Sequence, residues 1–226
     1  TRTKVIEAKR VEGFWKIIVE NQLTREVEEH QAKVLINAAG PWVADIINTK
    51  LQLNSKDTIR LVRGSHIVVP KLYDHEKCYF FQGTDGRIIF SIPYEYDFTL
   101  IGTTDADHDD IETKPNCSDA ERNYLINFAS QYFAKEIFPR DVVWSYSGVR
   151  PLYDDGTANA SAATRDYVLK LEHSEVSAPL LNIFGGKITT YRKLAEAAIA
   201  EVASFFPQLK ELSLIHISEP TRQWQI

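Results

Sequence analysis

The sequence predicts a mixed α/β fold of the α+β type, and three observations support this class. β-branched and aromatic residues recur in short runs along most of the 226 residues. An apolar strand, a glycine turn and a helical pattern follow one another twice, at residues 33–49 and 180–206. Between these two units, residues 59–104 carry strands separated by hairpin turn signals.

The first part of the chain predicts two strands followed by a strand-turn-helix unit. The strands at residues 5–9 and 14–20 have the spacing of a meander. The strand at residues 33–39 is apolar enough to be a buried parallel strand. It ends at Gly40, and Pro41 suits the first turn of a helix that reaches about residue 49.

The later elements alternate between hairpins and helices. Turn residues at 84–86 and 95–97 connect the strands of the central block, and Ser118 is a suitable N-cap for the helix that follows. We expect strands at residues 65–69, 78–82, 87–93, 99–103, 142–150 and 166–172, and helices at 119–135 and 193–206.

At 226 residues the chain is long enough to form one large domain or two small ones. Residues 213–226 continue neither a helix nor a strand, and their sequence is typical of a translated sequencing adapter. We therefore expect a non-native tail there, and a natural protein that continues beyond that point.

Bulk composition excludes several classes of protein. The formal net charge of -5 argues against non-specific nucleic-acid binding. Cys78 and Cys117 are far apart, so neither a disulfide framework nor a structural zinc site is expected. No apolar run approaches the roughly 20 residues that span a bilayer. The composition is that of an ordinary globular protein.

The turn at Gly185, Gly186 and Lys187 is the most informative local feature. An apolar strand ends there, and Thr189 and Thr190 stand where a helix begins. Glycines let backbone N–H groups approach an anion, and the helix dipole adds partial positive charge. A plain strand-to-helix turn explains the glycines equally well, but packing alone does not require the polar groups beside them.

Other motifs give weaker evidence for a functional site. The glycine turn is not a P-loop, because Ile188 stands where Ser or Thr is required, and no G-x-G-x-x-G fingerprint occurs anywhere in the chain. The acidic residues between 105 and 112 lack the EF-hand pattern and predict a solvated loop rather than a metal site. His66 alone suggests a structural histidine. Arg150 and Arg165 suggest either surface residues or a fork for phosphate or carboxylate.

Seven blocks together resemble the FAD-dependent glycerol-3-phosphate dehydrogenases. They cover about residues 1–205 in the order of that family, which makes the set far more specific than any one block. The blocks are VLINAAGPW at 34–42, GSHIVVP at 64–70, DGRIIFSIP at 85–93, TLIGTTD at 99–105, GVRPL at 148–152, TRDY at 164–167 and GGKITTYR at 185–192.

The resemblance implies a flavoprotein of the D-amino-acid-oxidase type. Residues 1–56 and 145–212 would belong to a Rossmann-like FAD-binding domain, and residues 57–144 to an antiparallel-sheet substrate domain. The N-terminal glycine fingerprint and the C-terminal domain of the family are absent, which implies part of a longer enzyme that is inactive alone. The residues implied to bind FAD are Ala39, Gly40, Pro41, Trp42, Gly185, Gly186, Lys187, Thr189 and Thr190.

The resemblance also implies a reaction of glycerol metabolism. Hydride would pass from C2 of sn-glycerol 3-phosphate to FAD, giving dihydroxyacetone phosphate, and electrons would continue to the quinone pool. His66, Arg150 and Lys187 would be catalytic, and all three would bind substrate together with Arg165. The parent enzyme would be a peripheral protein on the inner face of a bacterial cytoplasmic membrane, with a homodimer as its expected assembly.

Three alternatives stay open at this point. A glycerol-3-phosphate oxidase would use the same residues and pass electrons to oxygen. A flavin amine or hydroxy-acid oxidase would share the fold, although the two arginines favour a phosphorylated substrate. The chain alone could also be a catalytically inactive fragment or a weak phosphate-binding module, because FAD would lose its pyrophosphate site.

Overall fold

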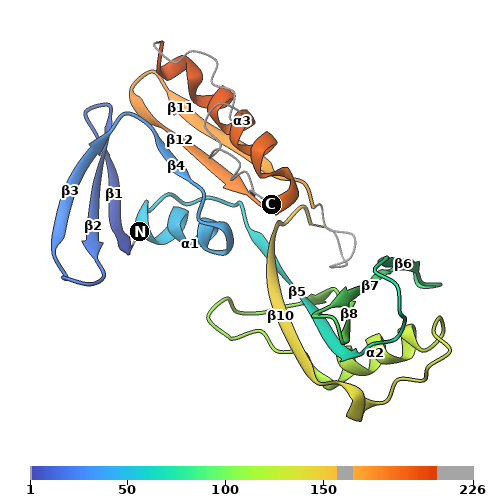
Figure 1. Cartoon of the computed structure of the whole chain (residues 1–226). Helices are drawn as coiled ribbons and strands as arrows, with labels where there is room; N and C mark the ends of the chain where they lie inside the picture. The colour runs from blue at the N-terminus through green and yellow to red at the C-terminus, as the bar shows by residue number, and fades with distance from the viewer. Residues whose placement is uncertain (1, 157–164, 208–226) are drawn as a thin grey trace, which may run out of the picture. The chain divides into compact units, whose positions relative to one another are not determined.

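The computed structural model describes residues 2–156 and 165–207, and these form two compact units. Unit 1 comprises residues 1–58 together with the chain from Arg165 onward, and unit 2 comprises Ile59–Thr164. The predicted mixed α/β class is confirmed, since both units combine antiparallel strands with short helices (Figure 1). The predicted tail at residues 213–226 lies outside the described residues.

Unit 1 contains an antiparallel meander, as predicted, and a second sheet. The first sheet has the order β1-β2-β3, and the second has the order β11-β12-β4. In the second sheet β12 pairs with β11 in antiparallel and with β4 in parallel fashion. The strands are β1 (Thr3–Val11), β2 (Phe14–Asn21), β3 (Val27–Ala32), β4 (Leu35–Asn37), β11 (Val168–Ser174) and β12 (Ser177–Phe184).

The helical segments of unit 1 follow its two parallel strands. After β4 the chain forms one short continuous helical stretch, and after β12 it forms the twelve-residue helix α3. Leu181 and Ile183 of β12 pack against Ala198 and Val202 of α3, which is the face that the helical spacing predicts. The segments are η1 (Gly40–Trp42), α1 (Val43–Asp45), η2 (Ile46–Lys50), η4 (Ile188–Thr190), α3 (Tyr191–Val202) and η5 (Ala203–Phe205).

Unit 2 is a six-stranded sheet with one helix packed on one face. Its order is β10-β5-β8-β7-β6, and β9 pairs with β5 beside this path. Ile67, Ile89 and Ile101 alternate with residues of the opposite face and pack against Leu125 of the helix. The elements are β5 (Ile59–Pro70), β6 (Tyr79–Gln82), β7 (Ile88–Tyr94), β8 (Phe98–Gly102), β9 (Ala106–Asp107), α2 (Asp119–Ala129), η3 (Pro139–Asp141) and β10 (Trp144–Tyr153).

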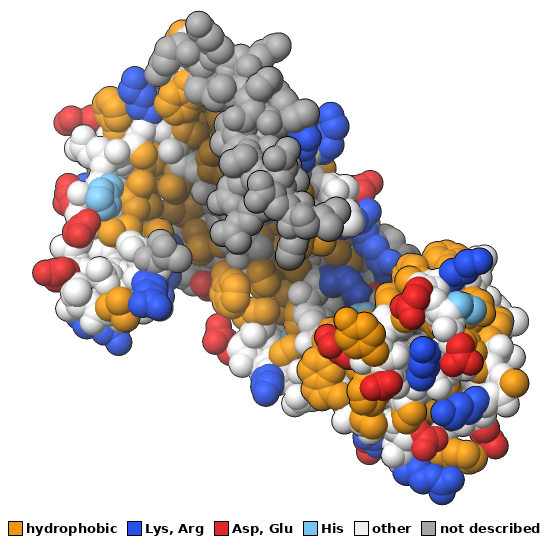
Figure 2. All heavy atoms as spheres, viewed as in Figure 1, with side chains coloured by type: hydrophobic (Ala, Val, Ile, Leu, Met, Phe, Trp, Pro, Cys, Tyr) orange, Lys and Arg blue, Asp and Glu red, His pale blue; other side chains and the backbone are white. Residues whose placement is uncertain are grey.

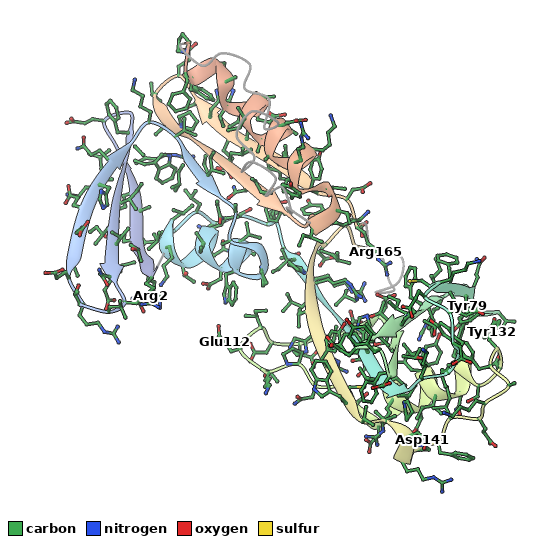
Figure 3. All side chains as sticks on the ribbon, viewed as in Figure 1. Arg2, Tyr79, Glu112, Tyr132, Asp141 and Arg165 are labelled. Atoms are coloured by element: carbon green, nitrogen blue, oxygen red, sulfur yellow. The ribbon has the colours of Figure 1, made fainter. Side chains whose placement is uncertain are left out.

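The surface of unit 2 that faces the viewer in Figure 2 mixes acidic, basic and apolar side chains. Aromatic side chains gather where β6 meets the end of α2, and the labels of Figure 3 place Tyr79 and Tyr132 there. The Tyr132 hydroxyl donates to the Gln82 carbonyl oxygen over 3.2 Å, and its ring stacks on Phe81. These contacts anchor the edge strand β6 to the segment after α2.

Several boundaries differ from the sequence prediction. The strand β3 was not predicted, because its residues are polar, and it forms by pairing with β2 from Trp15 to Glu20. The helix predicted over residues 119–135 ends at Ala129, although its Ser118 cap is confirmed by a full capping box with Glu121. We expected the first domain to resume at residue 145, whereas β10 pairs with β5 over its whole length and lies in unit 2.

Among the residues that the structure describes, no helix is both long enough and apolar enough to cross a membrane.

Candidate functional site

Two glycine turns lie at one edge of the parallel strand pair in unit 1. Leu35 to Asn37 of β4 run beside Leu180 to Asn182 of β12, in the same direction. Their carboxyl ends therefore meet at one edge, the place where sheets of this kind bind ligands. Gly40 follows β4 with a φ of +56°, and Gly185 and Gly186 follow β12 with φ of +70° and +108°. Only glycine adopts these conformations without strain.

A buried amide pair joins the two turns. The Asn37 Nδ2 atom donates to the Asn182 Oδ1 atom and to the Val43 carbonyl oxygen, each over 3.0 Å. Both asparagines are buried, and within the described part of the chain the Asn37 Oδ1 atom has no hydrogen-bond partner. The pair therefore fixes β4, β12 and the start of α1 together. Sequence reasoning missed it, although each asparagine interrupts an otherwise apolar strand.

The residues of this edge fit the polar and anionic groups of a flavin nucleotide. The first turn of a helix leaves backbone N–H groups without intrahelical partners, and η4 and α3 begin directly after the second glycine turn. Apolar side chains stand open beside them, with Ile188 88% and Trp42 45% exposed. The unpartnered Asn37 Oδ1 atom adds an acceptor. The Thr190 hydroxyl is less available to bind FAD than we expected, because it donates to the Lys187 carbonyl oxygen over 3.2 Å.

Lys187 and the segment that begins at Arg165 lie close together in unit 1. The Lys187 Nζ atom lies 3.5 Å from the Asp166 Oδ1 atom; the Lys187 side chain is about half exposed and that of Asp166 is largely exposed. Figure 3 labels Arg165 in the stretch that leads into β11. The fold therefore brings Lys187 to Asp166, the residue that follows Arg165 in the sequence.

His66 and Arg150, the other predicted pair, lie on one face of the sheet in unit 2. We call this the open face, because α2 packs on the opposite side. Strand pairing aligns one residue from each of five neighbouring strands in a row across this face, and His66 is one of them. Arg150 lies on the same face as Tyr146, because it is four positions further along β10. The row runs Phe80, Phe90, Gly102, His66, Tyr146.

Arg150 is held by the segment that follows β8. Its Nη2 atom donates to the Thr103 Oγ1 atom over 3.0 Å, and its Nη1 atom donates to the Asp105 Oδ1 atom over 3.2 Å. The Nη1 atom also reaches the Thr104 carbonyl oxygen over 3.4 Å. The guanidinium therefore has a fixed position, while its side chain stays 32% exposed. Asp105 belongs to the acidic stretch, and Asp107 of the same stretch pairs with Arg60.

His66 is neutral at physiological pH. Burial, and then the positive charge of Arg150, lower the pKa of His66 to about 4. The Tyr146 ring stacks on the imidazole with 4.8 Å between ring centroids and 3° between planes. The Nδ1 atom is buried, and no described residue hydrogen-bonds to it. A neutral imidazole beside a permanent cation can accept a proton or hydrogen bond while the cation stabilises negative charge.

Comparison with known proteins identifies the family. The family model described as DAO, FAD dependent oxidoreductase, matches residues 1–192. The chain is 43% identical over 210 residues to a glycerol-3-phosphate dehydrogenase of Pseudomonas tolaasii, and the match covers 93% of this chain and 41% of that protein. It is 44% identical over 209 residues to a D-erythritol 1-phosphate dehydrogenase of Brucella abortus, covering 92% and 41%.

A solved structure agrees with this assignment. The glycerol-3-phosphate dehydrogenase of Bacillus halodurans, complexed with FAD, superposes with a TM-score of 0.72 at 28% identity, over 93% of this chain and 40% of that one. The chain thus spans about two fifths of the length of the relatives it matches. The flavoprotein fold and the FAD cofactor expected from the sequence are both confirmed. The chain belongs to the DAO family of FAD-dependent oxidoreductases.

Proposed function

We propose that this chain is part of an enzyme that oxidises the C2 hydroxyl of sn-glycerol 3-phosphate to the ketone of dihydroxyacetone phosphate. One observation carries the proposal: a neutral His66 and a fixed Arg150 share the open face of unit 2. Relatives at 43% identity that are named for this activity support the choice of substrate. The proposal concerns the whole enzyme, to which this chain contributes about two fifths.

The residues of unit 2 suit the two events of alcohol oxidation. A hydride leaves C2 as the hydroxyl loses its proton, and the oxygen carries negative charge in the transition state. His66 accepts the hydroxyl proton or a strong hydrogen bond from it, because its imidazole is neutral at pH 7. Arg150 stabilises the charge on oxygen from a position already fixed by Thr103 and Asp105.

The residues of unit 1 suit the phosphate and the cofactor. Arg165 and Lys187 supply the positive charges that would orient the phosphate, Lys187 standing next to the flavin. FAD, when bound, supplies the acceptor for the hydride. Its nearest groups in this chain would be Ala39, Gly40, Pro41, Trp42, Gly185, Gly186, Lys187, Thr189 and Thr190.

A second substrate has specific support. The relative at 44% identity is named for D-erythritol 1-phosphate, and its identity to this chain equals that of the glycerol-3-phosphate enzyme within one percentage point. Both compounds are polyol phosphates, so the same arginine and lysine charges suit either. The two substrates differ by one hydroxymethylene unit, and a kinetic comparison separates them.

The later fate of the electrons belongs to the proposal as well. We propose that the whole enzyme passes them to a membrane quinone and works as a homodimer on the inner face of a bacterial membrane. A glycerol-3-phosphate oxidase would instead consume oxygen. Measuring oxygen uptake and quinone reduction with the same preparation distinguishes these acceptors.

The test uses a chimera in which the matching segment of the Pseudomonas tolaasii enzyme is replaced by the corresponding 210 residues of this chain. We expect the purified chimera to retain FAD and to oxidise glycerol 3-phosphate, with the unaltered Pseudomonas enzyme as control. A lower kcat/KM for glycerol 3-phosphate than for D-erythritol 1-phosphate would favour the second substrate. A flavin-containing chimera that oxidises neither compound would refute the proposal.

The isolated chain provides a separate test of its dependence on the rest of the enzyme. It lacks a G-x-G-x-x-G fingerprint, the motif whose helix terminus binds the pyrophosphate of a dinucleotide. We expect the chain to lose added FAD on desalting and to be inactive alone. A flavin absorption band that stays with the desalted chain would contradict this expectation.

A further inference from the structure

The open face of unit 2 carries glycine at positions where strands usually carry side chains. Glycine inside a strand weakens it and marks a close approach of another group. Gly64, Gly102 and Gly148 all lie within or at the end of paired strands, and none has a positive φ. The positive φ that usually selects glycine is therefore absent at all three positions, and the space beside the reactive pair gives a separate reason for glycine at two of them.

At Gly102 the reason is the imidazole of His66. The two residues face each other across the β5 and β8 strands. A Cβ atom added to Gly102 would lie 2.6 Å from Cγ and 2.7 Å from Nε2 of His66, whereas ordinary contacts begin at 3.4 Å. The Cγ atom is bonded directly to the His66 Cβ, so the ring cannot bend away without leaving its rotamer. Tyr146, on the strand at the other side of β5, stacks on the same ring.

At Gly64 the reason is the guanidinium of Arg150. A Cβ atom added there would lie 2.6 Å from the Arg150 Cζ atom. This side chain is long and could swing aside at little cost in stability. It would then lose the hydrogen bonds to Thr103 and Asp105 that fix it beside His66.

Gly148 shows that a glycine on this face need not have such a role. It pairs directly with Gly64, and a Cβ atom added to it would meet nothing within 4 Å. Gly148→Ala therefore adds a methyl group to the strand next to Gly64 without contacting His66 or Arg150. The chain thus supplies its own matched control.

We infer that Gly64 and Gly102 are positioning residues, whose missing side chains leave the space in which the Arg150 guanidinium and the His66 imidazole take their reactive places. This inference rests on the proposed function, because that function gives the two side chains their roles. It makes the two glycines determinants of catalysis although neither has a functional group.

Alanine substitutions in the chimera test the inference through kinetics. We expect Gly102→Ala to lower kcat/KM for glycerol 3-phosphate by about 100-fold, since misplacing a reactive group by about 1 Å costs that much. Gly64→Ala should lower it by at least about 10-fold with little change in thermal stability. Gly148→Ala should stay within about twofold. Equal effects of all three substitutions would overturn the inference.

A double substitution separates positioning from general damage to the sheet. If Gly102 acts only through the His66 ring, Gly102→Ala has no further effect on activity or melting temperature in a His66→Ala background. Should Gly102→Ala alone be insoluble, recovery of soluble protein by His66→Ala would support the clash. The same loss in both backgrounds would overturn it.

An NMR titration of His66 in the 226-residue chain gives a readout that needs no activity. The wild-type ring should titrate near 4, and His66→Ala identifies its signal. In Gly102→Ala the displaced ring gains solvent, so its pKa should rise toward 6.5, the ordinary value for histidine, while Gly148→Ala leaves it unchanged. If the unsubstituted chimera oxidises neither substrate, the proposed function fails, yet this titration still decides the positioning role. An unmoved His66 titration in Gly102→Ala would overturn it.

Discussion

Replacing Glu121 with glutamine should destabilise unit 2 and remove part of its acid sensitivity. Glu121 is buried, and its Oε1 atom accepts from Ser65 Oγ over 2.8 Å and from Thr104 Oγ1 over 2.7 Å. Its Oε2 atom accepts from Ser118 and lies 2.9 Å from the Arg63 Nη2 atom. Ser65 precedes His66, and Thr104 lies in the segment that holds Arg150, so the carboxylate braces the backbone beneath both reactive residues.

The pKa of Glu121 gives the magnitude. Burial by itself would raise this pKa, but hydrogen bonds from the Ser118 backbone and from the Thr104, Ser118 and Ser65 hydroxyls outweigh it and lower the pKa from 4.5 to about 2. A group whose pKa is lower in the folded state stabilises the fold above its unfolded pKa and loses this effect as the pH falls. The difference corresponds to about 3 kcal/mol at pH 7, and about 1.5 kcal/mol remains at pH 3.

Urea unfolding of the chain, followed by circular dichroism at pH 7 and pH 3, measures these values. Glutamine has the shape of protonated glutamate, so Glu121→Gln should lower the free energy of unfolding by about 3 kcal/mol at pH 7 and by about half of that at pH 3. Glu136→Gln is the control, because Glu136 is exposed in the same unit. A loss below about 0.5 kcal/mol at pH 7, or an equal loss at both pH values, would refute the reasoning.

Three further substitutions test unit 1. Asn182→Ala should cost about 1–3 kcal/mol by removing the acceptor of the buried Asn37 amide, and faster hydrogen exchange in β4 and β12 would report it. The exposed Asn54→Ala is the control; matching exchange in the two variants would count against a structural role for the pair. In the chimera, Lys187→Met should slow flavin reduction in stopped flow by about 10- to 100-fold at unchanged FAD content. A wild-type reduction rate would place Lys187 away from the reaction. Arg165→Ala should lower kcat/KM for glycerol 3-phosphate by about 10- to 100-fold with FAD retained, since a charge-assisted phosphate bond is lost. Exposed Arg25→Ala serves as its control, and an unchanged kcat/KM for Arg165→Ala would exclude the anchoring role.

Local sequence signals predicted much of the fold. Ser118 followed by Glu121 three residues later predicts the start of α2, and the structure confirms the capping box. Strand runs bounded by turn residues predicted the central hairpins, because turn chemistry acts over a few neighbouring residues. The strand β3 escaped prediction, since Val27–Ala32 is polar and gains its conformation from pairing with β2.

The candidate site, too, has features that the sequence predicts and features that only the tertiary structure decides. From the sequence alone, the family resemblance predicted which residues would carry the chemistry. Local signals determined the glycine turn at 185–186, because a left-handed turn depends on neighbouring residues only. Only the tertiary structure decided that Asn37 meets Asn182 across 145 positions, and that His66 lies between Tyr146 and Gly102. The neutral state of His66 depends on burial and on the charge of Arg150, and both arise from strand register, which brings distant segments into contact.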